Sequence, residues 1–586
     1  MPFAFDAEAV ELEDEADNDD SGRCRMGGAE VPDSCGLNLY RADPSLARLA
    51  ALYLPPVLFR HLEPHFDRLG ALAGGHLDEL AGQADRNPPA LHVRSRTGDD
   101  GDWIEKHPSY RAMEELAFGE FGLAALSHRG GVLGWPTPMP PAAKYLLTYL
   151  FVQAEFGLMC PVSMTDSLTR TLRKFGDPAL VARYLPALTG QDLDALTQGA
   201  MFMTEQGAGS DVGATAVRAQ RAADGTWRLS GDKWFCSNAD AGLAMVLARP
   251  EDAPAGLQGL SLFLLPRVLP DGQRNAYRIV RLKDKLGTRS MASGEITLQG
   301  ATAFLVGEQG AGFRQMADMI NNSRLSNGVR AAGLMRRAVT EALFVAHRRV
   351  AFGRKLVELP LMRRQLLKML VRAEQARSMM LQTADALRRS DAGEPGAYAL
   401  LRILTPLIKF RACRDARVVA GDAMEVRGGC GYIEEWPDPR ILRDAHLGSI
   451  WEGTSNIVAL DVRRAAKREH GLAALRSHVG ALLQQVPPLA DAGAALDRAC
   501  ALMDASYGDG GEVLARQAAS ALYHVTAAAA MAWEAGRLQD PHRLALARMV
   551  LVHRVLPRDP LRGEVGEEAS VAGLLCDPGA SARCQS

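Results

Sequence analysis

A single carboxylate, Glu452, stands in an uncharged segment whose residue types suit proton transfer. The segment reads Ser449-Ile450-Trp451-Glu452-Gly453-Thr454-Ser455-Asn456. The run from 457 to 464 then reads as a helix, so the carboxylate lies on a loop just before a helix. An apolar neighbour such as Trp451 would desolvate it there. A base that removes a weakly acidic proton near neutral pH needs such a setting, because burial disfavours the charged form of a carboxylate.

The same segment has a plainer interpretation. Thr454, Ser455 or Asn456 could cap the helix, since their side-chain oxygens accept from free N–H groups of the first turn. The negative charge of Glu452 would then interact favourably with the N-terminal end of the helix dipole, and the residue would take no part in chemistry. The segment alone leaves both interpretations open.

A second stretch suits the close approach of a ligand to the backbone. It reads Met203-Thr204-Glu205-Gln206-Gly207-Ala208-Gly209-Ser210-Asp211. Its small residues let backbone N–H groups approach a ligand, and Thr204 and Ser210 add hydroxyls. The pattern is not GxGxxG and no βαβ unit surrounds it, which argues against a Rossmann site.

An aromatic pair beside a Ser and an Asn forms the third stretch, Lys233-Trp234-Phe235-Cys236-Ser237-Asn238. Stacking on Phe235 and a hydrogen bond from Ser237 would suit a flat heteroaromatic ring. An amphipathic strand would show the same pattern.

Two further stretches suit a nucleotide. The first, His347-Arg348-Arg349-Val350-Ala351-Phe352-Gly353, combines cations with one aromatic, as a phosphate and an adenine require. It reads equally as a helix C-terminus with favourable cations before a Gly. The second, Arg427-Gly428-Gly429-Cys430-Gly431-Tyr432, allows close backbone approach after a helix.

The composition is that of a globular protein without a strong global field. The chain has 586 residues, is 47% hydrophobic and carries a formal net charge of −2, so charge alone points to neither nucleic acid nor membrane. Its nine Cys are scattered without a CxxC pair, which predicts no metal site and no disulfide framework. No secretory signal and no bilayer-spanning stretch are apparent, so we expect a cytoplasmic protein.

Five regions are predicted to position these stretches. An acidic tail over 1–36 precedes a helical domain over 37–200, with helices expected at 45–54, from 108 with Ser109 as cap, at 142–158 and at 165–174. A small antiparallel β domain covers 201–310, with strands at 226–231, 244–248, 260–265 and 294–298. A bundle of long helices covers 311–470, at 316–349, 361–388 and 396–427. Residues 471–586 form an extra helical region.

The extra region holds the notable local concentration of positive charge: Arg537, Arg543, Arg548, Arg554, Arg558 and Arg562. A solvated helix face is one interpretation, and a patch that contacts phosphates is the other. Across 471–586, ten Arg face twelve Asp and Glu, so a nucleic-acid face would depend on arrangement.

The order of these stretches in a helical–β–helical layout resembles the acyl-CoA dehydrogenase flavoproteins. The predicted fold class is therefore α+β, mainly α, with the acyl-CoA dehydrogenase fold and an extra C-terminal helical region. Within the family the chain looks most similar to the AidB-like, alkylation-response (isovaleryl-CoA dehydrogenase-like) branch. The stretches that carry this are Asp271-Gly272-Gln273-Arg274-Asn275-Ala276, Leu282-Lys283-Asp284-Lys285-Leu286-Gly287 and Pro360-Leu361-Met362-Arg363.

The resemblance implies a non-covalent FAD between the β domain and the bundle, in a homotetramer with shared sites. Glu452 would be the base that takes the α proton of an acyl-CoA thioester, while a β hydride passes to flavin N5 and later to an electron-transfer flavoprotein. At the alternative position for the base, on the first long helix of the bundle, this chain has Ser323. Ser210 and Arg324 would contact substrate. The residues implied to contact FAD are Met203, Thr204, Ser210, Phe235, Ser237, Arg349, Phe352, Gly428, Gly429, Trp451, Thr454 and Asn456.

The AidB-like resemblance also implies a second function. The C-terminal region would bind duplex DNA through Arg537, Arg543, Arg548 and Arg554, and dehydrogenation would be weak. Dehydrogenation is the leading interpretation and DNA binding the alternative.

Overall fold

A computed structural model of the chain describes residues 31–486, 489, 491–557, 561 and 572–580. Most of the predicted tail, Arg558 and Arg562 therefore lie outside the described residues. The N-terminal domain is helical, and Pro opens many of its helices, where its missing N–H costs no hydrogen bond. Its helices are α1 Pro44–Tyr53, α2 Pro56–Ala73, α3 His76–Arg86, α4 Pro108–Glu114, α5 Pro141–Phe151, α6 Met159–Phe175 and α7 Pro178–Leu188.

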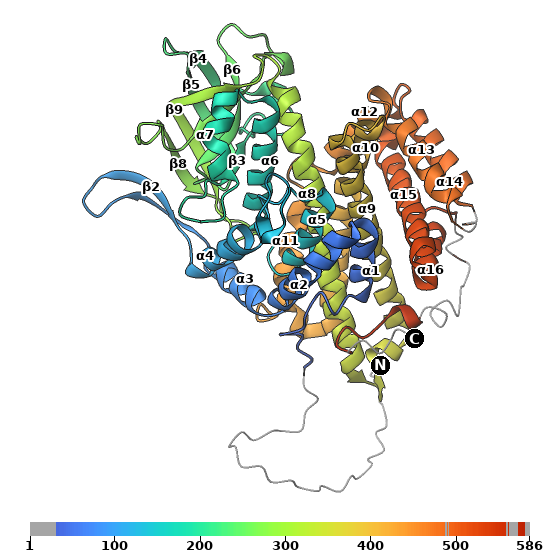
Figure 1. The fold of residues 1–586 in the computed structure, drawn as a ribbon. Helices are drawn as coiled ribbons and strands as arrows, with labels where there is room; N and C mark the ends of the chain where they lie inside the picture. Colours follow the sequence, from blue (N-terminus) through green and yellow to red (C-terminus); the bar gives the residue numbers. More distant parts are fainter. Residues whose placement is uncertain (1–30, 487–488, 490, 558–560, 562–571, 581–586) are drawn as a thin grey trace, which may run out of the picture.

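Two local expectations in this domain are wrong, and one hairpin was not predicted. The hairpin of β1 Ala90–Arg94 and β2 Asp100–Glu105 was not expected, and it projects from the domain (Figure 1). His107, rather than Ser109, accepts the capping hydrogen bond of α4. The single helix expected at 142–158 is broken, because α5 ends at Phe151 and a buried turn leads into α6. A Cβ at Gly157 would come within 2.6 Å of Ser290 Oγ, so only glycine fits this turn.

The middle domain is a β barrel packed beside the helices (Figure 1). Its strands are β3 Gly199–Phe202, β4 Arg218–Arg221, β5 Trp227–Ser237, β6 Leu243–Pro250, β7 Ser261–Pro266, β8 Tyr277–Leu282 and β9 Ser293–Val306. Pairing runs β3-β6-β4-β5-β9-β7, and β6 also pairs β7, which closes the ring. Most pairs are antiparallel as predicted, but β6 pairs in parallel with both β3 and β4.

The long helices appear where the sequence predicted them. The bundle contains α8 Gly312–Arg348, α9 Pro360–Asp391, α10 Ala397–Arg427, α11 Pro437–Gly448 and α12 Ser455–Arg468. Between α8 and α9, β10 Val350–Ala351 and β11 Arg354–Lys355 form a short hairpin. Residues 322–343 of α8 are almost all buried, because α8 runs through the middle of the molecule (Figure 1).

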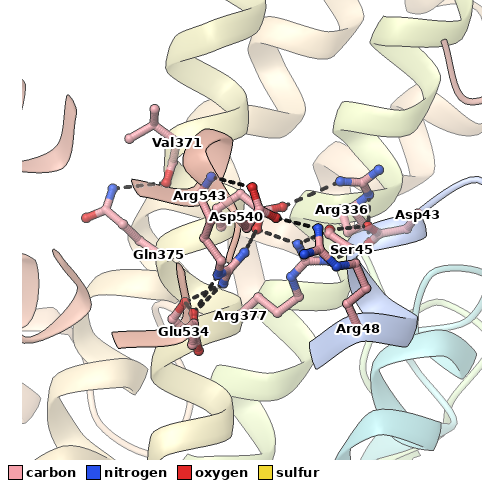
Figure 2. A network of polar contacts seen from close by, with 12 residues as sticks. Asp43, Ser45, Arg48, Arg336, Val371, Gln375, Arg377, Glu534, Asp540 and Arg543 are labelled. Carbon is pink, nitrogen blue, oxygen red and sulfur yellow. Dashed lines mark hydrogen bonds and ion pairs between the residues drawn. The ribbon is translucent and has the colours of Figure 1, made fainter. Parts of the chain in front are cut away.

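The extra region adds α13 Gly471–Gln484, α14 Ala492–Ala505, α15 Ala515–Leu538 and α16 Pro541–Arg554, which pack against the bundle (Figure 1). The buried ion pair of Arg543 with Glu374 joins this region to α9, and Arg48 of α1 pairs with Asp540 at 2.8 Å (Figure 2). Within the described residues, no helix has the length and apolar character needed to cross a membrane.

Candidate active site

Glu452 lies in the turn between α11 and α12 with a left-handed backbone, φ 54°. The turn directs its carboxylate at α8. Ser323 Oγ donates to Oε1, and Asn327 Nδ2 donates to Oε2 at 2.5 Å. The side chain is thus held by neutral donors from a helix more than a hundred residues away in the chain. Both carboxylate oxygens therefore bind α8.

The start of the helix after Glu452 lacks the capping contact predicted for Thr454. Thr454 occupies the N-cap position of α12, but its side chain makes no capping hydrogen bond. The predicted cap position is therefore correct and the capping contact is wrong. Asn456 Oδ1 instead accepts from Arg516 Nη1 of α15 at 3.2 Å.

Two buried cations hold the main chain around Glu452. Arg324 Nε donates to the Glu452 carbonyl at 3.0 Å, and its Nη1 pairs with Asp461 at 2.6 Å. Lys409 Nζ donates to the carbonyls of Trp451, at 2.8 Å, and Gly453. Burial lowers the pKa of Lys409 from its ordinary 10.5 to about 8. Arg324, predicted to touch substrate, here supports the turn that carries Glu452.

The low pKa of Lys409 makes stability depend on pH in a defined direction. The folded protein releases this proton near pH 8, whereas the unfolded chain keeps it to about 10.5, so the unfolded state binds more protons between these values. Rising pH therefore stabilises the folded wild type relative to Lys409→Met, by about 2 kcal/mol between pH 8 and 9.5. Denaturant unfolding of both proteins across this range measures the difference. Lys368→Met, on the surface, is the matched control; an equal slope for Lys409→Met and wild type would contradict the assignment.

An aromatic pair covers the side of the turn that faces the helices. Trp451 and Phe156 stack with ring centroids 6.1 Å apart. The guanidinium of Arg330 lies 4.8 Å from the Trp451 centroid and 5.4 Å from that of Phe156. Sequence reasoning missed Asn327, Arg330 and Lys409 as parts of the site. The available signal was the helical spacing of the polar residues 323, 327 and 330, which places them on one face of the predicted helix.

The β-domain stretches meet each other and approach the same end of α8. Trp234 N donates to the Thr204 carbonyl at 2.9 Å, which places the small-residue loop beside the aromatic strand. Met203 and Trp451 pack against one apolar cluster that includes Met316, Met319 and Ile320 of α8. Phe235 is 56% exposed and Ser237 is half-buried, so both are available to a ligand, as is the exposed Ser210.

The remaining predicted cofactor residues gather at the other end of α8. Arg349 Nη1 donates to the Arg427 carbonyl at 2.9 Å. A Cβ added at Gly428 would lie 3.1 Å from Arg349 Nη1. A Cβ added at Gly429 would meet nothing within 4 Å. Phe352, at the hairpin tip, is 92% exposed. Along α8 the rise to Arg349 is about 50 Å from Met316, beside Met203, and about 30 Å from Arg330, beside Trp451. The predicted residues therefore form two groups rather than one.

A polar cavity of about 670 Å³ lies on another face of α8, between α5, α6, the end of α9 and the start of α10. It is lined by Asn322 and Leu325 of α8, whereas Ser323 and Asn327 face Glu452. Buried Asp166 accepts there from His128 at 3.0 Å and from Lys144 at 2.8 Å. The carboxylate of Glu452 thus lies outside this cavity.

The predicted basic cluster is not one surface. Arg543 is buried and paired with Glu374 at 2.8 Å and Glu534 at 2.6 Å, so the expectation that it contacts DNA is wrong (Figure 2). Arg554 is partly buried, and burial lowers its pKa. Arg537 and Arg548 are exposed. The physical reason is that α16 packs one face against α9 and α15, and position 543 falls on that face.

Comparisons with known proteins agree with this architecture. Three family models match in succession: the adaptive response protein AidB N-terminal domain over residues 29–195, the acyl-CoA dehydrogenase middle domain over 200–301 and the acyl-CoA dehydrogenase C-terminal domain over 310–467.

Relatives and a solved structure extend the match beyond single domains. AidB of Escherichia coli K12 is 38% identical over 410 residues, which are 67% of this chain and 72% of AidB. Acyl-CoA dehydrogenase family member 11 of Caenorhabditis elegans is 32% identical over 76% of this chain and 73% of its own length. The crystal structure of Caenorhabditis elegans ACDH-11 with C11-CoA superposes with a TM-score of 0.85 at 27% identity, covering 92% of this chain and 95% of that one. The chain therefore belongs to the acyl-CoA dehydrogenase family, in the branch that carries the AidB N-terminal domain.

Proposed function

We propose that this protein is an FAD-dependent oxidoreductase that removes two hydrogens from the Cα–Cβ bond of a CoA thioester. The observation that carries the proposal is the carboxylate of Glu452, held against α8 by Ser323 and Asn327 beside the half-buried Trp451. The family supports the reaction type, and the C11-CoA in the worm protein's crystal supports a thioester as substrate.

In this proposal Glu452 takes the proton from the carbon α to the thioester. Ser323 and Asn327 orient the carboxylate and satisfy its oxygens without supplying a positive charge at either hydrogen bond. Arg324 and Lys409 keep the turn rigid through the carbonyls of residues 451 to 453, so that little reorganisation is needed when the proton moves. Bound FAD would supply the two-electron oxidation by accepting the β hydrogen as hydride.

The residues of the β domain fit a flavin ring. Phe235 exposes more than half of its surface beside Trp234, and Ser237 offers a hydroxyl on the same strand. A Cβ added at Gly207 or Gly209 would meet nothing within 4 Å, so the neighbouring loop leaves room for a ligand. Met203, Thr204 and Ser210 lie on this loop. Trp451 and Thr454 lie on the turn that carries Glu452, and Asn456 lies in the first turn of α12.

The second group of cofactor residues supports a shared site. Arg349, Phe352, Gly428 and Gly429 lie toward the other end of α8, about 50 Å along the helix from Met316 and about 30 Å from Arg330, which contacts Trp451. In this proposal they contact the FAD of a second copy, which makes the protein a homo-oligomer, with a tetramer expected. The exposed Phe352 and Tyr432, 92% and 79% accessible in the single chain, fit such an interface.

The direct test is anaerobic titration of the purified yellow protein with a panel of acyl-CoA thioesters. We expect the oxidised flavin absorbance to bleach with at least one thioester, and to return when an electron-transfer flavoprotein is added as acceptor. A flavin that stays oxidised with every thioester, yet is reduced by dithionite, would contradict the proposal. That result would favour the alternative, in which the C-terminal region binds duplex DNA, with Arg537 and Arg548 as its exposed candidates.

A further inference from the structure

Arg330 is a fully buried cation without a matching anion. It lies on the face of α8 that carries Ser323 and Asn327, about 4.5 Å further along the helix than Asn327. Its Nε reaches only the Ser326 carbonyl, at 3.4 Å, and within the described part of the chain its Nη1 and Nη2 have no hydrogen-bond partner. An unpaired buried charge is costly, so such a group calls for a partner.

Two neighbours of Glu452 also carry unmatched polar atoms. Trp451 Nε1 and Asn327 Oδ1 are buried and lack partners among the described residues. The Trp451 ring lies 4.8 Å from the Arg330 guanidinium, and the Asn327 side chain contacts the Glu452 carboxylate. Unmatched donors and an acceptor therefore gather around the candidate base.

The local charges add up to a positive excess. Three buried cations, Arg324, Arg330 and Lys409, face the carboxylates of Glu452 and Asp461, and Asp461 is also shared with Arg402 at 2.9 Å. The thiols of Cys160 and Cys413 do not compensate, because burial raises the pKa of both. An anionic ligand would balance this region.

The position of the β domain places Arg330 at the far end of such a ligand. Met203 of the β-domain loop packs in the same apolar cluster as Met316, Met319 and Ile320, so this loop lies beside the part of α8 that precedes Ser323. A ligand that extends from this loop along α8 reaches Ser323 and Asn327 with Glu452 first, and Arg330 about one helical turn later. Arg330 therefore faces the tail of an acyl group and not its thioester.

We propose, on the basis of the function proposed above, that Arg330 selects an acyl chain ending in a carboxylate. The substrate is then the CoA monothioester of a short dicarboxylic acid, with its free carboxylate bound by Arg330 Nη1 and Nη2 and by Trp451 Nε1. A guanidinium is suited to this role because its parallel N–H groups match both carboxylate oxygens. The competing explanation is that Arg330 serves only as a packing group stacked on Trp451 and Phe156.

The test compares two thioesters of equal carbon number, glutaryl-CoA and valeryl-CoA, with wild type, Arg330→Met and Arg330→Lys. Met keeps the length and apolar packing but removes the charge, and Lys keeps the charge but not the paired donors. We expect wild type to favour glutaryl-CoA by about 100-fold in kcat/KM. Valeryl-CoA lacks the terminal carboxylate, so the donors of Arg330 would stay unpaired when it binds. Arg330→Met should reverse the preference, and Arg330→Lys should retain part of it.

Binding gives a second readout that does not depend on turnover. Without thioester, Arg330→Met should melt at a higher temperature than wild type, because it removes an unpaired buried charge. Glutaryl-CoA should raise the melting temperature of wild type and not that of Arg330→Met, while valeryl-CoA should act alike on both.

The outcomes separate the two proposals. If valeryl-CoA bleaches the flavin and glutaryl-CoA neither binds nor bleaches it, the role of Arg330 is wrong and the proposed dehydrogenation stands. An unchanged preference in Arg330→Met also overturns the inference and leaves Arg330 as a packing group. If neither of these two thioesters binds or bleaches the flavin but another of the panel does, the role of Arg330 is wrong and the proposed dehydrogenation stands. If no thioester of the panel bleaches the flavin, both proposals fail.

Discussion

Replacing Glu452 by Gln is expected to slow thioester oxidation by about 10³–10⁴-fold, because the amide cannot accept the α proton at neutral pH. The effect should fall on kcat, since Gln has nearly the shape of Glu and the contacts that position the turn come from main-chain carbonyls. Single-turnover bleaching of the flavin under anaerobic conditions measures the rate directly.

The structure predicts that the Glu452→Gln protein folds normally. Ser323 Oγ can still donate to the amide oxygen, in place of its bond to Oε1. The new NH₂ group would meet the donor Nδ2 of Asn327, but Asn327 Oδ1 has no partner among the described residues, so a flip of that amide restores a hydrogen bond. We therefore expect an unchanged melting temperature and an unchanged flavin spectrum.

A second measurement isolates the base from the redox step. Exchange of the thioester α hydrogen with deuterated water requires the base and no net oxidation. Wild type should catalyse the exchange and Glu452→Gln should not. Exchange at the wild-type rate in the variant would show that another group removes the proton.

Replacing Arg543 by Ala is expected to destabilise the protein by about 3–5 kcal/mol, the range for breaking a buried ion pair by removing one partner. Arg543 Nη1 donates to Glu374 at 2.8 Å, its Nε to Glu534 at 2.7 Å and its Nη2 to Ser378 at 2.7 Å (Figure 2). Its loss removes a positive partner from two buried carboxylates.

The network explains why the effect should spread through the molecule. Glu374 also pairs with Arg377, and Arg377 Nη1 pairs with Asp43 at 2.5 Å, ahead of α1. Glu534 accepts from Tyr53 at 2.8 Å. One set of contacts therefore ties the extra region to the bundle and to the N-terminal domain (Figure 2).

The matched control is Arg548→Ala, which removes the same charge from the exposed side of the same helix and should change stability by about 0.5 kcal/mol at most. Urea unfolding followed by circular dichroism measures both variants. Equal midpoints for Arg543→Ala and Arg548→Ala would contradict the buried network. Since Arg543→Ala is expected to be unstable, a loss of DNA binding in that variant would not identify a DNA contact.

The sequence by itself determined the family, the helical–β–helical order and the position of Glu452 before a helix. These features are local: glycine-rich loops, aromatic pairs and long apolar periodicities are legible in short windows. The helices at 316–349 and 361–388 were predicted within a few residues of α8 and α9, because thirty residues of unbroken periodicity leave few alternatives. The apolar periodicity continues through the buried turn at Gly157. The sequence therefore predicted one helix where the structure has two, α5 and α6.

Only the tertiary structure decided which groups Glu452 and Arg543 contact. The partners of Glu452, Ser323 and Asn327, are 129 and 125 residues away, so no local pattern distinguishes a base from a cap. Arg543 and Arg548 look alike in sequence, yet one is buried between three helices and the other is exposed. Helical spacing shows which residues share a face, but it does not show which faces other elements cover. That depends on contacts between segments that are distant in the sequence. A charge buried by such contacts is stable only when one of these segments also supplies its oppositely charged partner.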